Sequence, residues 1–356
     1  MNGDRVVNEV KRVFDDVGAV AERLRADGLA REEPLRPGGF VPLGAPAFDP
    51  GGEDLVVQAA RIERDRVVSD GVAGLAKVAE GRENDLDARE RFGLEAIVLL
   101  EGRPAILIQG GDFLPPPRDW AQLAGARTGI REVIARSGRI EVTGHLDYIW
   151  VGTASLVAPS AIMTNRHVAQ EFCSRRGSNW VFRSGMTSRI DFLGERDSTA
   201  SLEFAITSVI GIHEDRDLAL LRVEATSSDG RSLPDPLAVS ARMPADIYGR
   251  AVYVIGYPQS DGRRREPESL RRIFGHIYDV KRLQPGRAVQ YSTRFSALEH
   301  DCSTLGGNSG SPVVDLETHQ VIGLHFGGRY GQGNYAVPLW MLSDDPLLAK
   351  GGINFQ

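Results

Sequence analysis

Apolar residues recur at helical spacing near the start of the chain. Between residues 6 and 24 they lie three or four positions apart, and Gly28 stands where this pattern stops. A second stretch with the same period covers residues 53–80. Both stretches predict amphipathic helices, and the first is expected to be one continuous helix. Between them, residues 34–52 hold five prolines and five glycines, which predict a linker or an irregular wrap.

The pattern changes in the middle of the chain. Residues 94–109 contain two short apolar runs around Glu101-Gly102-Arg103-Pro104, which predict a β-hairpin. Three prolines at 115–117 interrupt regular structure, and a short helix is expected over residues 129–136.

From residue 138 onward, short β-rich segments follow one another with turn residues between them. Regularly spaced short strands favour a sandwich or barrels over a parallel α/β sheet. The predicted organisation is a helical region at 1–85, a connecting segment at 86–137 and a mainly β domain at 138–350. The segments include RIEV, IWVGTASLV, AIMTN, LALLRV, AVYVIGY, SPVVD and VIGLHFG.

Composition and charge exclude several classes of protein. Apolar residues make up 42% of the 356 positions and charged residues 25%, which is ordinary for a globular protein with a buried core. The net charge of -6 argues against a surface that neutralises phosphates, so no nucleic-acid partner is expected. No run approaches the ~20 apolar residues that span a bilayer. Charges scattered through the first 25 residues leave no apolar core of a secretory signal, and the chain has only two cysteines, so a cytoplasmic location is predicted.

Ser309 lies in the sequence Gly306-Gly307-Asn308-Ser309-Gly310-Ser311-Pro312. Small residues allow a tight backbone turn that presents one hydroxyl without obstruction, a setting that favours a nucleophile. Glycine at 307 would also let its N–H point, together with that of Ser309, at a developing oxyanion.

Two further blocks carry groups that serve such a serine. His167 ends a strand-like run, where its ring can be held rigidly beside a cleft. Asp217 precedes the apolar run Leu218-Ala219-Leu220-Leu221, which places a carboxylate at the edge of a buried strand, although neighbouring Asp215 is an alternative. Each residue alone is also compatible with a structural role.

The order His167, Asp217, Ser309, with gaps of 50 and 92 residues, is more informative than any one block. An α/β-hydrolase would run Ser, Asp, His, and its turn would read Gly-x-Ser-x-Gly. The blocks TNRHV, DLALL and GGNSGSPV resemble the triad blocks of chymotrypsin-like serine proteases. This resemblance implies two six-stranded antiparallel β-barrels, with His167 and Asp217 from the first and Ser309 from the second. It further implies an acyl-enzyme mechanism with an oxyanion hole formed by Gly307 and Ser309.

Two stretches, STLGGNSGSP and IGLHFGG, resemble bacterial glutamyl endopeptidases of the staphylococcal V8 type. The resemblance implies that Thr304 and His325 line the pocket for the residue before the scissile bond and favour glutamate, with Gly327 and Gly328 also binding substrate. One departure is Asn308, because many relatives activated from a zymogen carry an aspartate there that pairs with a freed amino terminus. That ion pair cannot form in this chain.

The remaining expectations concern partners and alternatives. The substrate is expected to be a protein or peptide, and the N-terminal region is either a helical embellishment or a regulatory, partner-binding segment. Alternative functions are a binding module on an inactive protease scaffold and an esterase that uses the same triad. No cofactor and no metal site are expected, because no His/Cys cluster has zinc spacing. The other histidines are predicted to be structural or surface residues, namely His145, His213, His276, His300 and His319.

Overall fold

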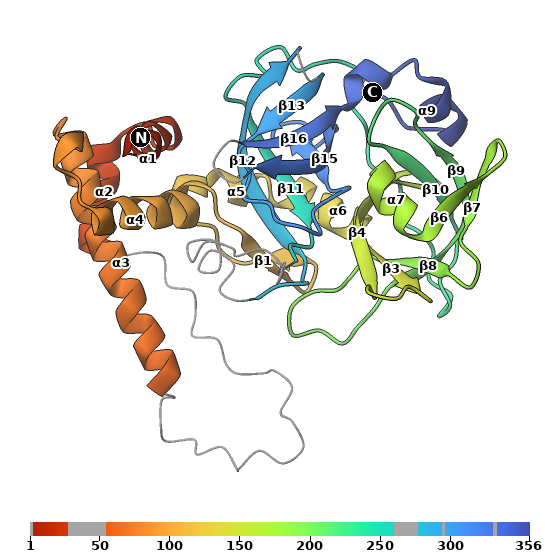
Figure 1. Ribbon diagram of the computed structural model, residues 1–356, viewed down its shortest axis with the longest axis horizontal. Helices are drawn as coiled ribbons and strands as arrows, with labels where there is room; N and C mark the ends of the chain where they lie inside the picture. Colours follow the sequence, from red (N-terminus) through yellow and green to blue (C-terminus); the bar gives the residue numbers. More distant parts are fainter. Residues whose placement is uncertain (1–2, 28–54, 260–276, 294–295, 330–332) are drawn as a thin grey trace. The chain divides into compact units, whose positions relative to one another are not determined.

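The computed structural model describes residues 3–27, 55–259, 277–293, 296–329 and 333–356. They form two compact units (Figure 1). The helical unit comprises described residues up to Gly102 together with 117–120, and the barrel unit comprises 103–116 and the described residues from 121 onward. The connecting segment predicted at 86–137 is thus divided between the two units. The predicted linker at 34–52 and His276 lie outside the described residues.

The helical unit consists of helices and helical turns. The stretch expected to be one helix is two, because the chain breaks at Phe14–Asp16 and the Asp16 carboxylate accepts a hydrogen bond from Ala19 N–H (2.9 Å), which starts a new helix. The predicted second helix is confirmed. The elements are α1 (Gly3–Val13), α2 (Val17–Asp27), α3 (Leu55–Ala79), η1 (Glu83–Asp85), α4 (Ala88–Ile97), the π-helical turn η2 (Val98–Gly102) and η3 (Arg118–Trp120). No helix among those described has both the length and the apolar character needed to cross a membrane.

Helices α3 and α4 cross with their backbones in contact. A Cβ atom added to Gly93 would lie 2.2 Å from the backbone nitrogen of Gly71, so only glycine fits at this crossing. Leu75, Leu94 and Ile97 are fully buried beside it and form the centre of a core shared with α1 and α2. The helical unit therefore has a hydrophobic core of its own.

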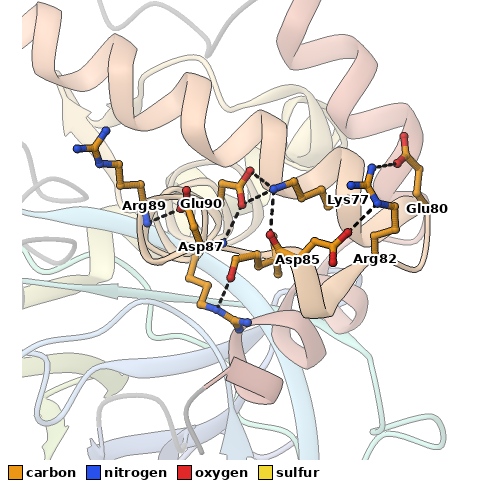
Figure 2. Close-up of polar contacts among 9 residues, drawn as sticks. Lys77, Glu80, Arg82, Asp85, Asp87, Arg89 and Glu90 are labelled. Carbon is orange, nitrogen blue, oxygen red and sulfur yellow. Dashed lines mark hydrogen bonds and ion pairs between the residues drawn. The ribbon is translucent and has the colours of Figure 1, made fainter.

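Charged side chains join the end of α3 to the start of α4 (Figure 2). Asp87 caps α4 through hydrogen bonds from the N–H groups of Arg89 and Glu90, and the Glu90 side chain accepts from Asp87 N–H. Lys77 forms an ion pair with Glu90 at 2.6 Å and donates to the carbonyl of Asp85 at 3.0 Å. These contacts fix where α4 begins relative to α3.

The hairpin predicted at 94–109 lies elsewhere. Residues 94–102 are helical, and the hairpin consists of β1 (Ile106–Gln109) and β2 (Asp112–Phe113). Gly110 and Gly111 make the turn with φ of +64° and +72°, values that glycine adopts at little cost. The expected short helix is confirmed as α6 (Arg127–Arg136), preceded by α5 (Gln122–Gly125).

The first barrel is closed by six antiparallel strands in the order β10-β5-β4-β3-β8-β9. Its strands are β3 (Ser137–Thr143), β4 (Trp150–Ala158), β5 (Ala161–Thr164), β8 (Thr187–Asp191), β9 (Glu203–Ile212) and β10 (Ala219–Val223). Helix α7 (Arg166–Phe172) and the hairpin β6 (Cys173–Arg176) and β7 (Asn179–Phe182) extend from it. Leu156, Ile190 and Leu221 are among the fully buried residues of its core.

The second barrel has the order β11-β14-β15-β16-β13-β12 and is closed by pairing of β11 with β12. Its strands are β11 (Ala251–Gly256), β12 (Arg282–Ser292), β13 (Ala297–His300), β14 (Pro312–Asp315), β15 (Val321–Arg329) and β16 (Gly333–Pro338), followed by η4 (Leu339–Leu342) and α9 (Pro346–Gly351). Strand β1 adds to the edge of β12, with Ile106 opposite Leu283. The predicted two-barrel, mainly β fold is confirmed.

Candidate active site

The pairing of β5 with β10 brings His167 to Asp217. Thr164 at the end of β5 lies opposite Ala219 at the start of β10, and because the strands are antiparallel, the residues after Thr164 meet those before Ala219. The His167 ring Nδ1 lies 2.7 Å from Asp217 Oδ2, and His167 N–H donates to Asp217 Oδ1 at 3.0 Å. Of the two aspartates considered from the sequence, Asp217 is the one that meets the histidine.

The segment around Asp217 is held by side chains of the His167 turn. Asn165 donates an amide hydrogen bond to the carbonyl of Asp217 at 2.8 Å, and the Arg166 guanidinium donates to the carbonyl of Arg216. Burial alone would raise the pKa of the Asp217 carboxyl, but the hydrogen bonds from His167 and the charges of His167 and Arg166 hold that pKa below the ordinary value of an aspartate. The carboxylate is therefore stabilised in its charged form.

Ser309 lies on a turn that two glycines make possible. Gly307 and Gly310 have φ of +82° and +87°. A Cβ atom on Gly310 would lie 2.1 Å from the carbonyl oxygen of Thr153, so the turn can approach β4 this closely only with glycine there. Thr153 N–H donates to the carbonyl of Ser309 at 2.9 Å, which ties the turn to the first barrel.

Val168, the residue after His167, and Ser309 approach the same residue of β4. A Cβ atom on Gly152 would lie 2.8 Å from Val168, the neighbour of His167, and 3.0 Å from the carbonyl oxygen of Ser309. Among the described side chains, however, no hydrogen bond joins Ser309 Oγ to His167. The structure thus pairs the histidine with the aspartate and places the serine turn beside them on β4.

Two backbone donors of the serine turn have no acceptor among the residues that the structure describes. The N–H groups of Asn308, Gly310 and Ser311 donate to the carbonyls of Leu305, His325 and Asn308, respectively. The N–H groups of Gly307 and Ser309 alternate with them and make no such bond within the described part of the chain. N–H groups without an acceptor are the kind of donor that a site for a negatively charged oxygen atom requires.

The residues predicted to bind substrate lie in two different environments. His325 in β15 is 2% exposed, and its Nδ1 lies 3.1 Å from Nε2 of His300. Thr304 is half-buried in the loop before the serine turn, and no hydrogen bond within the described residues joins it to His325. Gly327 would offer open space to a Cβ atom, whereas Gly328 packs against the side chain of Asn334. Of these four residues, His325 has the most defined polar surroundings.

Both rings of the histidine pair are neutral. Complete burial lowers the pKa of His300 to about 3. Burial, followed by the charges of His300 and His167, lowers the pKa of His325 well below its ordinary value. Three other histidines have polar partners away from this pair. His145 Nε2 lies 3.4 Å from a carboxylate oxygen of Glu171, and His213 Nε2 lies 3.1 Å from one of Asp345. His319 Nδ1 lies 3.0 Å from the hydroxyl oxygen of Tyr253.

Three buried residues that contact the site were not identified from the sequence. Thr153 contacts the serine turn, Gln284 bonds to Asn308, and His300 bonds to His325. A usable signal existed for His300, because in a strand it shares a face with Leu298, an apolar residue two positions earlier. No motif of the sequence singles out Thr153 or Gln284.

Comparisons with known proteins show which family the chain belongs to. Residues 152–324 match the trypsin-like peptidase domain and include His167, Asp217 and Ser309. A probable serine protease of Lysobacter enzymogenes is 30% identical over 372 residues, covering 89% of this chain and 94% of that protein. A glutamyl endopeptidase of Staphylococcus aureus is 56% identical over 190 residues, covering 53% of this chain and 46% of that protein, so the match spans less than half of its length.

Solved structures are more distant. A serine endoprotease from Yersinia pestis is 16% identical with a TM-score of 0.43, over 63% of this chain and 66% of that chain. The active form of a protease from M. tuberculosis is 21% identical with a TM-score of 0.41, over 63% of this chain and 84% of that chain. The similarity to the Lysobacter protein extends along nearly the whole chain, and the peptidase domain match agrees with it. The chain therefore belongs to the trypsin-like serine proteases.

Proposed function

We propose that the chain is a serine endopeptidase in which Ser309 is the nucleophile, His167 the general base and Asp217 the group that orients the histidine. The observation that carries the proposal is the 2.7 Å contact between His167 Nδ1 and the charged Asp217 carboxylate. An ionised carboxylate can only accept a hydrogen bond, so Nδ1 carries the hydrogen and the lone pair is left on Nε2, the nitrogen that takes the serine proton.

In the proposed reaction, Ser309 Oγ attacks the scissile carbonyl carbon while its proton passes to His167 Nε2. The carbonyl oxygen becomes negatively charged and accepts hydrogen bonds from the N–H groups of Gly307 and Ser309. The C–N bond then breaks, His167 gives its proton to the leaving amine, and an acyl-enzyme remains on Ser309. Water activated by His167 hydrolyses this ester and restores the enzyme.

Labelling with a fluorophosphonate probe tests this assignment first, with the intact chain compared to Ser309→Ala. Loss of the nucleophile in such a triad lowers turnover on the order of 10⁶-fold. Labelling of the wild-type chain alone would support the proposal, and equal labelling of the variant would exclude Ser309 as the nucleophile. Cleavage of ester but not peptide substrates would instead identify an esterase, and an unlabelled, inactive wild-type protein would fit a binding module.

We further propose a preference for glutamate before the scissile bond, and the protons of the histidine pair support it. If His300 Nε2–H donates to His325 Nδ1, then His300 Nδ1 is left as an acceptor, and this buried atom has no partner in the described part of the chain. With the protons reversed, the same atom would be a buried N–H without an acceptor, which is rarer in folded proteins and costs more. The first arrangement is favoured, and it leaves a proton on His325 Nε2.

A neutral His325 that carries a proton on Nε2 is a hydrogen-bond donor for a substrate carboxylate. In the proposal, the Thr304 hydroxyl supplies a second donor. Peptides that differ only in having Glu, Gln, Arg or Leu before the cleaved bond test this preference. Higher kcat/KM for Glu than for its neutral isostere Gln would support it, and preferred cleavage after Arg or Leu would exclude it.

Two further parts of the proposal concern the whole protein. We propose that the helical unit is a regulatory segment and a binding site for a protein partner, since it has its own core and contributes none of the three triad residues. We also keep cytoplasmic location as a proposal, which fractionation of the source cells would test.

A further inference from the structure

The residue before the nucleophile is anchored by a reciprocal pair of amides. Gln284 Nε2 donates to Asn308 Oδ1 at 2.9 Å, and Asn308 Nδ2 donates to Gln284 Oε1 at 3.3 Å. Both side chains are fully buried. Each amide therefore satisfies one donor and one acceptor of the other in a place that water does not reach.

The surroundings allow the Asn308 amide little freedom. Its Nδ2 also contacts the carbonyl of Leu305 at 3.3 Å. On the other side lies the backbone of Gly256, where an added Cβ atom would come within 2.3 Å of Asn308 Oδ1. Gln284 is fixed in turn because β12 pairs with β11, with Gln284 opposite Val254.

Asn308 stands between Gly307 and Ser309, the two residues whose N–H groups face no acceptor within the described residues. A rotation of the Asn308 backbone would turn the peptide that carries Ser309 N–H, and a displacement of Asn308 would move Gly307 through the peptide bond that joins them. From this we infer that Gln284 is a positioning residue, which orients the oxyanion donors by holding the side chain of Asn308. The inference rests on the proposed function, since it concerns the same site.

The pair of Gln284 and Asn308 carries no charge. Two amides are neutral at every pH at which the protein is folded, and neither requires an ionic partner. The pair thus takes the place of an ion pair between an acidic residue and a freed amino terminus. In the inference, the pair orients the serine turn without a charged partner for Asn308.

Two variants of Gln284 and one control test this role. Gln284→Met keeps the length of the side chain but removes its amide, and a donor displaced by about 1 Å typically costs on the order of 10²-fold in rate. We expect kcat of this variant to fall about 10²-fold with KM changed by less than about threefold, because the interaction is made in the transition state. Gln290→Met is the matched control, since Gln290 lies on the same strand and its bond to Glu299 is exposed. It should keep wild-type kcat.

Gln284→Glu gives a readout that a purely structural residue would not move. A protonated carboxyl has one donor and one acceptor and can rebuild the reciprocal pair, whereas the ionised form has acceptors only. Burial raises the pKa of such a carboxyl. The ratio of kcat in Gln284→Glu to kcat in the wild type should therefore be near one at low pH and fall as the pH rises.

The outcomes separate the inference from the function on which it rests. A wild-type chain that neither labels with fluorophosphonate nor cleaves peptides overturns the proposed function, and the inference with it. With an active wild type, unchanged kcat in a folded Gln284→Met overturns the inference alone. If Gln284→Met does not fold, the pH profile of Gln284→Glu decides, and a ratio that stays flat with pH overturns the inference.

Discussion

The hydroxyl of Thr153 donates a hydrogen bond to the carbonyl oxygen of Gly307 at 2.8 Å. The same hydroxyl accepts from Tyr257 N–H at 3.4 Å, and the backbone N–H of Thr153 donates to the carbonyl of Ser309. A single residue of the first barrel thus holds the turn of the second barrel at the two residues proposed to form the oxyanion hole.

Thr153→Val keeps the shape of the side chain and removes both hydroxyl contacts. One such hydrogen bond is worth about 1 kcal/mol, so we expect kcat to fall about fivefold to tenfold. Thr207→Val is the matched control, because the Thr207 hydroxyl makes an exposed, long contact of 3.4 Å to the carbonyl of Arg222. Steady-state kinetics of both variants check the prediction, and equal kcat in both would contradict it.

Asp217→Asn is expected to lower kcat about 10⁴-fold while the fold is kept, since an amide favours the wrong histidine tautomer. The folded pKa of Asp217 lies below that of an unfolded aspartate, about 3.9. The stability that its charge contributes is therefore complete above that pH and is lost as the pH falls through the folded value. Urea midpoints of the wild type and the variant should differ near pH 5 and converge as the pH falls below about 4; a difference that does not shrink below that pH would refute the assignment.

Gly256→Ala tests whether the close contact between the Gly256 backbone and the Asn308 side chain positions the serine turn. Its Cβ atom would lie 2.1 Å from Ser311 Oγ and 2.3 Å from Asn308 Oδ1, and both side chains are fully buried. We expect kcat to fall about tenfold or more, because Asn308 must move. Gly125→Ala, where an added Cβ atom meets no atom within 4 Å, should leave kcat unchanged. Kinetics together with thermal unfolding distinguish a shifted turn from loss of the fold.

His300→Leu removes the group that fixes the proton on His325. The hydrogen bond to a charged substrate group is worth about 1.5–3 kcal/mol, so kcat/KM for a peptide with Glu before the cleaved bond should fall about tenfold to 10²-fold. The peptide with Gln at that position serves as the control and should be affected less. An equal loss of kcat/KM for the two peptides would show that His300 affects only the packing of the site and not the recognition of glutamate.

Gly93→Ala tests whether the helical unit restrains the protease. Its Cβ atom would lie 2.2 Å from Gly71 N, and overpacking of this kind costs about 1–3 kcal/mol. We expect a lowered thermal transition of the helical unit and faster fluorophosphonate labelling of Ser309. Gly18→Ala, whose Cβ atom would have its nearest contact at 3.4 Å, is the control. A lowered transition with an unchanged labelling rate would remove the regulatory role.

Local patterns predicted a mainly β domain of short strands, and the resemblance of three blocks to chymotrypsin-like proteases implied the two barrels and the common origin of His167 and Asp217 in the first. Each residue of the proposed triad stands beside an apolar run or a glycine turn that folds in a predictable way. Predictions failed where a polar group overrides the periodicity, as where Asp16 starts a new helix. The hairpin prediction for residues 94–109 also failed, because the turn of the hairpin lies after these residues, at Gly110-Gly111.

The residues that sequence reasoning missed are partners brought together across a sheet. Gln284 meets Asn308, and His300 meets His325, only through the register of the strands in the second barrel. Nothing in the residues next to Gln284 along the chain indicates that pairing. Such contacts become visible only once the strands are placed.

Strand β1 covers part of an edge that would otherwise remain open. It pairs with β12 at Leu283, and the Arg282 guanidinium donates to the carbonyl of Ala105, 177 residues away. An unpaired strand edge is a template for association between molecules, so a protein cut at residue 138 would expose β12 and be prone to aggregate. During synthesis β1 also leaves the ribosome long before its partner, and this pairing is among the contacts of longest range, which fold slowly. The second barrel is thus finished by a strand made before either barrel exists.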